Sequence, residues 1–143
     1  MTYKSNSPKE TSNIAKAFAK KLKKGDVVCL SGDLGTGKTA FVQALASALG
    51  VTDYVSSPTF TIVNCYEGNL PVYHFDVYRI ADPDEMYEIG YEEYVYGDGI
   101  SVIEWPELIS EILPEERYDI TISKNFEMHA DFREITREKR GQE

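Results

Sequence analysis

The sequence is poor in the residues from which metal centres and disulfide frameworks are built. Two cysteines and two histidines occur among its 143 residues. The cysteines, Cys29 and Cys65, show no C-x-x-C spacing and no cluster of histidines accompanies them, which argues strongly against a zinc site. Each cysteine lies in an apolar or β-branched run that is typical of a strand. We therefore expect two buried thiols that serve as small apolar side chains.

Long hydrophobic segments are also missing. No stretch approaches the roughly eighteen consecutive apolar residues by which a transmembrane helix is recognised. The first ten residues are polar and lack the apolar core of a secretory signal. The apolar share of 42% and the charged share of 27% are typical of a folded globular chain. We therefore expect a cytoplasmic protein without a membrane partner.

Positive charge is scarce. Fifteen Lys and Arg stand against 24 Asp and Glu, which gives a formal net charge of −9. A domain that grips RNA by itself shows the reverse balance, because Lys and Arg supply most of the affinity for phosphates. Any RNA is therefore expected to be held by a partner protein. Between residues 82 and 98, seven acids interleave with tyrosines and form either a protein interface or a solvated helix face.

The pattern of apolar residues predicts alternating helices and strands. The length suits one domain, residues 1–143, with the order of the tail after about residue 124 left open. Helices are predicted over residues 11–23, capped by Thr11 or Ser12, over 38–49, over 83–94 with an interruption near Gly90, and after Pro106. Strands are predicted over residues 27–31, 59–66, 72–78, 100–104 and 118–123, with room for one more in the tail. This order indicates a three-layer α/β domain whose central sheet is mixed and mainly parallel.

A glycine-rich segment follows the first of these strands. Residues 32–39, Gly-Asp-Leu-Gly-Thr-Gly-Lys-Thr, satisfy the pattern G-x-x-x-x-G-K-[ST] at every required position. In such a loop the backbone of Gly35, Thr36 and Gly37 directs N–H groups at phosphate oxygens, assisted by the positive end of the following helix. Lys38 reaches the β- and γ-phosphates, and the Thr39 hydroxyl ligates magnesium. The motif predicts a P-loop NTPase-like fold that binds ATP or ADP with Mg²⁺.

Two acids end neighbouring apolar segments. Asp76 closes the run Val-Tyr-His-Phe-Asp, and Glu104 closes Ile-Ser-Val-Ile-Glu. Ligands of open α/β sheets collect at the carboxyl ends of parallel strands, and magnesium needs one or two carboxylates. At least one of the two acids is therefore expected to bind the metal, and the residues alone leave open which one. His74, inside its strand, is expected to be a packed or hydrogen-bonded core residue.

Four segments in order carry a resemblance to a known family. They are residues 32–39, residues 57–60 (Ser-Pro-Thr-Phe), residues 74–79 (His-Phe-Asp-Val-Tyr-Arg) and residues 103–107 (Ile-Glu-Trp-Pro-Glu). In this combination the chain resembles the TsaE family from about residue 11 to residue 123. The resemblance implies an ATPase that supports the TsaB–TsaD complex, which transfers a threonylcarbamoyl group to the adenosine next to the anticodon of ANN-reading tRNAs. The tRNA would be contacted only through those partners.

The resemblance also implies roles for individual residues. Thr39 and Glu104 would be linked to magnesium, with Asp76 the strand-end acid nearby. Catalysis would fall to Lys38, Glu104, Asp76 and Thr59.

Three further positions are implied to lie around the nucleotide. Trp105 would be close to the nucleotide site and Thr11 near the nucleoside, although a place in the core and a helix cap explain these two residues equally well. The loop with Ser57 and Thr59 would lie near the γ-phosphate, like a switch segment; ordinary turn formation accounts for Ser-Pro-Thr as well.

Other functions share part of this pattern. A GTPase would carry an N/T-K-x-D motif, which is absent, and a small-molecule kinase usually needs an arginine-rich lid, whereas three of the five arginines here lie in the tail. A non-catalytic module, whose nucleotide only sets its affinity for partners, shares every motif with the ATPase. We expect an ATPase that is slow alone and depends on its partners.

Overall fold

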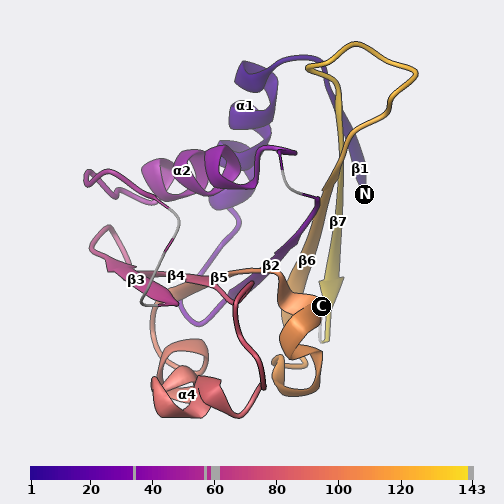
Figure 1. The fold of residues 1–143 in the computed structure, drawn as a ribbon. Helices are drawn as coiled ribbons and strands as arrows, with labels where there is room; N and C mark the ends of the chain where they lie inside the picture. Colours follow the sequence, from indigo (N-terminus) through magenta and orange to yellow (C-terminus); the bar gives the residue numbers. More distant parts are fainter. Residues whose placement is uncertain (34, 57, 59–61, 142–143) are drawn as a thin grey trace.

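The computed structural model describes residues 1–33, 35–56, 58 and 62–141. Within these residues the strands form one seven-stranded sheet in the order β1-β7-β6-β2-β5-β4-β3 (Figure 1). The strands are β1 (Thr2–Ser5), β2 (Val27–Ser31), β3 (Val63–Tyr66), β4 (Val72–Asp76), β5 (Ile100–Glu104), β6 (Arg117–Ser123) and β7 (Arg133–Arg140).

The four central strands, β6, β2, β5 and β4, run parallel to their neighbours, and the outer pairs β6–β7, β7–β1 and β4–β3 are antiparallel. The predicted α/β fold with a mixed, mainly parallel sheet is thereby confirmed. In the register, Glu104 of β5 is level with Asp76 of β4 and with Leu30 of β2. The carboxyl ends of three parallel strands therefore meet at one edge of the sheet.

Helices cover both faces of the sheet. On one face α1 (Pro8–Ala19) packs against α2 (Lys38–Ala48), and the other face carries α3 (Glu85–Glu88), α4 (Tyr91–Val95) and the 3₁₀ helix η1 (Pro106–Ile112) (Figure 1). Because successive strand residues point to opposite faces, Val28 and Leu30 of β2 join the core under α1 and α2. Val27 and Cys29 join the core on the opposite side.

The first helix begins earlier than predicted. The Ser7 hydroxyl accepts the Glu10 amide at 3.1 Å, and Pro8 occupies the first turn, so the expected cap at Thr11 or Ser12 is wrong. The helix ends at Ala19 rather than at residue 23. The overlooked signal is Ser-Pro-Lys-Glu at residues 7–10, since Ser followed three residues later by Glu is a typical helix start.

The prediction for the two cysteines is half right. Cys29, in a central strand, is buried, and burial raises the pKa of its thiol to about 12. Cys65 lies in a strand as expected but is exposed, because β3 is the last strand of the sheet. A strand at the edge of a sheet has fewer neighbours to cover its side chains.

The remaining elements follow the predicted order with some differences. Strand β3 begins at Val63, and residues 59–61 of the strand predicted over 59–66 lie outside the described residues. The helix predicted after Pro106 is a 3₁₀ helix. Strands β2 and β5 have the predicted bounds, and Gly90 at φ +79° separates α3 from α4. The tail contributes β7, and β1 was not predicted. Within the described residues, no helix is long and apolar enough to cross a membrane.

Candidate functional site

A glycine-rich loop, residues 32–37, connects β2 to α2 at the edge where the parallel strands end. Its Gly35 (φ +79°) and Gly37 (φ +99°) adopt left-handed conformations that other residues rarely accept. A Cβ added at Gly37 would meet no heavy atom within 4 Å, so the space above the loop is open. No side chain caps α2 at Gly37, which leaves first-turn N–H groups to bind an anion. Leu34 lies outside the described residues.

Lys38 is the first residue of α2 and is turned into the site. Its Nζ donates to the Gly32 carbonyl oxygen at 2.6 Å and lies 3.5 Å from the centroid of the Trp105 ring. Burial lowers the pKa of the ammonium, and the negative charges of Glu104 and Glu107 oppose that shift. The structure thus holds a buried cation at the mouth of the glycine-rich loop, with acids close enough to affect its charge.

The two strand-end acids lie side by side in different surroundings. Glu104 is 3% exposed, and its Oε2 is 2.6 Å from Nε2 of His74. His74 is fully buried, as predicted for a hydrogen-bonded core residue, and its Nδ1 has no partner among the described residues. Asp76 is only half-buried and accepts the Tyr78 amide at 3.1 Å. Burial raises the pKa of the Asp76 carboxyl, and the neighbouring Glu104 adds to the effect.

Trp105 occupies an unusual backbone conformation. Its φ of 62° and ψ of 44° are left-handed values that an aromatic residue rarely adopts. The turn places its indole beneath the Lys38 ammonium and 4.9 Å, centroid to centroid, from the ring of Tyr78. Residues in such strained conformations concentrate at binding sites, and this one brings the ring against the lysine that follows the glycine-rich loop.

A residue from the tail reaches the same loop. Arg133, at the start of β7, donates from Nε to the Thr36 carbonyl oxygen at 2.9 Å and from Nη1 to the carbonyl oxygens of Ala130 and Phe132. Sequence reasoning missed this contact. Its sequence separation is 97 residues, and nothing in the local pattern indicates which of the tail arginines turns inward.

A cavity of about 160 Å³ lies between the start of α1 and the glycine-rich loop. Its lining comes from three parts of the chain: Pro8, Thr11, Ser12, Thr36, Gly37, Ala40, Asp131 and Arg133. The structure thus brings Thr11 beside Thr36 and Gly37, and its role near the nucleoside stays a prediction. The Thr11 hydroxyl is buried and bonded to the Ser5 hydroxyl at 2.7 Å.

The predicted site residues fall into three groups. Gly35, Thr36 and Gly37 form the glycine-rich loop, with Thr11 across the cavity from it. Lys38, Thr39, Asp76, Glu104 and Trp105 gather at one edge of the sheet. Ser57 and Thr59 lie outside the described residues. Among the described residues, no group of three or more His, Cys, Asp or Glu could enclose a metal ion. A hydroxyl and two carboxylates instead suit a hard cation that completes its shell with phosphate and water oxygens.

Comparisons with known proteins agree on one family. The family model for the threonylcarbamoyl adenosine biosynthesis protein TsaE matches residues 5–135. The chain is 47% identical over 137 residues to the tRNA threonylcarbamoyladenosine biosynthesis protein TsaE of Bacillus subtilis, covering 95% of this chain and 84% of the relative. It is 44% identical to the protein of the same name from Treponema pallidum, covering 83% of this chain and 87% of that one.

A solved structure gives the same result. The crystal structure of YdiB from Bacillus subtilis superposes with a TM-score of 0.84 at 42% identity, covering 99% of this chain and 86% of YdiB. The chain therefore belongs to the TsaE family of threonylcarbamoyl adenosine biosynthesis proteins.

Proposed function

We propose that this chain binds ATP with magnesium and hydrolyses it in support of the TsaB–TsaD complex, which threonylcarbamoylates the adenosine next to the anticodon of ANN-reading tRNAs. One observation carries the proposal. A buried lysine, an uncapped helix start and two carboxylates converge at one end of the sheet. Each of these groups has a defined use in binding and splitting a nucleoside triphosphate.

The nucleotide would lie along the glycine-rich loop, with its phosphates and its nucleoside on different sides of it. The phosphates would lie against the backbone of residues 35–39, where the first-turn N–H groups of α2 point outward. The nucleoside would lie across the opening of the cavity of about 160 Å³ beside Thr11 and Asp131, because the cavity alone is too small to enclose a base and a sugar. Arg133 supports this arrangement because it ties the Thr36 carbonyl, and so the loop itself, to β7.

The residues at the strand ends then divide the chemical work. Lys38 would exchange its bond to the Gly32 carbonyl for phosphate oxygens. Thr39 and Glu104 would hold magnesium, with Asp76 acting on it from outside its shell, and the metal would neutralise charge on the phosphates. Glu104, which is bonded to His74, would accept a hydrogen bond from the attacking water.

The proposed reaction is slow in the isolated chain. An arginine that stabilises the developing charge contributes several powers of ten in related reactions. The guanidinium of Arg133 is already bonded to three carbonyl oxygens and cannot serve this purpose without leaving them. We therefore expect the TsaB–TsaD complex to complete the site, with tRNA reached only through those partners.

The test is magnesium-dependent ATP hydrolysis by the chain alone and with TsaB, TsaD and tRNA. Lys38→Ala and Glu104→Ala should abolish turnover, whereas Lys20→Ala, an exposed position on the first helical segment, should leave it unchanged. Trp105 is the sole tryptophan and contacts Lys38, so its fluorescence reports ATP binding separately from turnover.

The outcomes separate the competing functions. Weak activity that rises with the partners and disappears in both variants supports the proposal. If Trp105 fluorescence titrates with ATP but no phosphate is released under any condition, the chain is a non-catalytic, nucleotide-dependent partner-binding module. Rapid turnover that ignores the partners would instead indicate another small P-loop enzyme, such as a kinase.

A further inference from the structure

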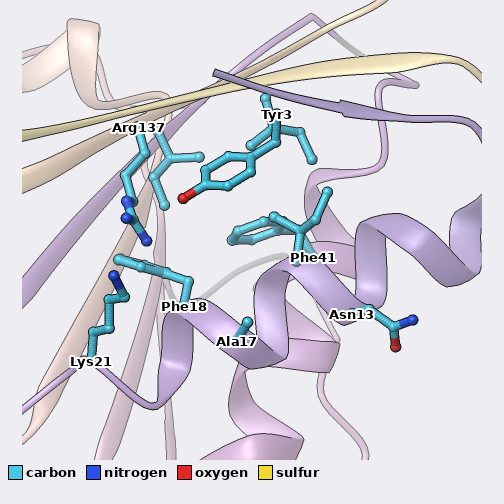
Figure 2. A pocket seen from close by; sticks show the side chains of 10 residues that line it. Tyr3, Asn13, Ala17, Phe18, Lys21, Phe41 and Arg137 are labelled. Carbon is cyan, nitrogen blue, oxygen red and sulfur yellow. The ribbon is translucent and has the colours of Figure 1, made fainter. Parts of the chain in front are cut away.

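A second cavity lies on the side of α1 that faces β7 and β1. Its volume is about 250 Å³, and it shares no lining residue with the cavity beside the glycine-rich loop. Figure 2 shows side chains from both ends of the chain around it, with Tyr3 of β1 above and α1 and α2 below. Its apolar lining comes from Tyr3, Ile14, Phe18, Phe41, Ile120 and Ile135.

Two cations stand on one side of this apolar space. In Figure 2 the Lys21 ammonium and the Arg137 guanidinium approach the same flank of the cavity, and the Tyr3 hydroxyl is turned toward that flank. The guanidinium carbon of Arg137 is 5.6 Å from the Tyr3 ring centroid and 5.2 Å from that of Phe18. Arg137 also donates from Nη2 to the Met1 sulfur at 3.2 Å.

Neither cation has an acidic partner within the part of the chain that the structure describes. Two other cations close in the sequence are paired, Lys23 with Asp26 at 3.3 Å and Arg140 with Asp119 at 2.9 Å, whereas Lys20 and Lys139 have no acidic partner among the described residues. In a chain with a net charge of −9, acids are plentiful. Two cations without carboxylates beside an apolar cavity therefore form a surface that is complementary to an anion carrying an apolar body.

The size and lining of the cavity narrow the class of ligand. A cavity of about 150 Å³ holds benzene, and pockets for drug-sized molecules begin near 300 Å³. At about 250 Å³ this cavity fits one ring with a short chain. Beyond the two cations, the polar groups in its lining are the Tyr3 hydroxyl and the Asn13 amide, too few to satisfy a sugar or a nucleotide.

We propose that this cavity is a binding site for a small aromatic carboxylate. The ring would contact Phe18, Phe41 and Ile135, and the carboxylate would accept hydrogen bonds from Lys21 and Arg137. The site is separate from the proposed nucleotide site, and its occupation does not require ATP.

Phenylpropanoate is a suitable probe, with phenylpropanol and phenylpropylamine as neutral and cationic controls of the same shape. Binding to the full chain is followed by NMR through the methyl groups of Ile14, Ile120 and Ile135. We expect a Kd on the order of 1 mM for the carboxylate. The alcohol should bind about fivefold more weakly because it lacks the ion pair, and the amine more weakly still.

Variants test the two halves of the site. Arg137→Gln and Lys21→Gln should each weaken phenylpropanoate about threefold to fivefold and leave phenylpropanol unchanged. Lys20→Gln, the exposed neighbour outside the cavity lining, is the matched control. Ala17→Phe, at an exposed position in the lining, should block both compounds without disturbing the core.

Four results would overturn the proposal. Equal binding of the acid and the alcohol would show that the cavity binds apolar groups without recognising the carboxylate. If no methyl signal shifts at a phenylpropanoate concentration about tenfold above the expected Kd, the cavity is not a binding site. Shifts of the backbone amide signals of residues 35–39, recorded beside the methyl signals, would assign the anion to the glycine-rich loop. A short peptide ending in phenylalanine that binds tenfold more tightly than phenylpropanoate would identify a protein partner as the occupant.

Discussion

Strands β4 and β5 each end in a carboxylate at the same level of the sheet, but the two carboxylates have different surroundings. Asp76 and Glu104 are register partners on neighbouring parallel strands. Glu104 is buried and bonded to a buried imidazole, whereas Asp76 is half-buried and bonded to one backbone amide. One acid is fixed in place by side chains and the other can still respond to a ligand.

The difference originates two residues before Asp76. His74 points to the same side of β4 as Asp76 because side chains alternate along a strand, and it reaches across to the neighbouring strand end. The position of an acid at the end of a strand therefore does not by itself determine how rigidly its carboxylate is held. The side chain next to it decides whether its carboxylate is rigid, which matters for a group that must orient water.

The largest expected effect comes from removing the support of Glu104. His74→Leu leaves a carboxylate buried without its partner, so the free energy of unfolding should fall by about 3–5 kcal/mol at neutral pH. Urea denaturation measures the loss. His129→Leu, at the exposed histidine, is the control and should change stability by less than about 1 kcal/mol. If both variants unfold at the same urea concentration, Glu104 does not depend on His74.

Next in size is the loss of the carboxylate itself. Glu104→Gln keeps the shape of the side chain and should lower kcat for ATP hydrolysis about a hundredfold, in the range of general acid–base contributions. Binding of ATP, followed by Trp105 fluorescence, should change only a few-fold. A variant with wild-type kcat would show that Glu104 has a structural role alone.

A smaller effect is expected at the neighbouring strand end. Asp76→Asn should lower kcat or the affinity for magnesium about tenfold. This is the low end of the loss seen when a residue that contacts a metal's ligands, rather than the metal, is replaced. The assay is the same, with magnesium titrated at saturating ATP. A loss at Asp76 that exceeds the loss at Glu104 would reverse the assignment and make Asp76 the direct ligand.

The smallest effect concerns pH. Folding raises the pKa of the Asp76 carboxyl, so the folded protein binds this proton more tightly than the unfolded chain does. The free energy of unfolding therefore falls as pH rises from about 4, the ordinary pKa of Asp, through the pKa in the folded state. Asp76→Asn removes this contribution. In metal-free protein, the stability of the variant relative to wild type should therefore increase over that interval. A constant difference across the interval would contradict the raised pKa.

Much of the central sheet and its edge could be predicted from local pattern. Strands β2 and β5 are apolar runs bounded by turns, and the glycine spacing of residues 32–39 identifies the loop between β2 and α2. These features are readable because each depends on neighbours in the sequence. The gathering of Lys38, Asp76 and Glu104 then follows from the rule that parallel strands end at one edge.

The outer strands and the contacts of the tail could not be predicted from local sequence pattern. Strand β1, Thr-Tyr-Lys-Ser, has no apolar alternation, and it exists because β7, at the far end of the chain, supplies its hydrogen bonds. The contact of Arg133 with Thr36 could not be predicted for the same reason, because the two residues are 97 positions apart in the sequence. The exposure of Cys65 depends on strand order, which places β3 at the edge. Each of these outcomes is a tertiary effect that overrides local preference.

The pairing of β1 with β7 has a consequence for synthesis of the protein. The Met1 amino group donates to the Arg137 carbonyl across 136 residues, and Arg133 reaches back 97 residues to the glycine-rich loop. A nascent chain therefore carries its glycine-rich loop out of the ribosome long before the strand that steadies it. The contact of Arg133 with Thr36 can form only after β7 has been synthesised, so the loop and the first helices must fold or wait without it.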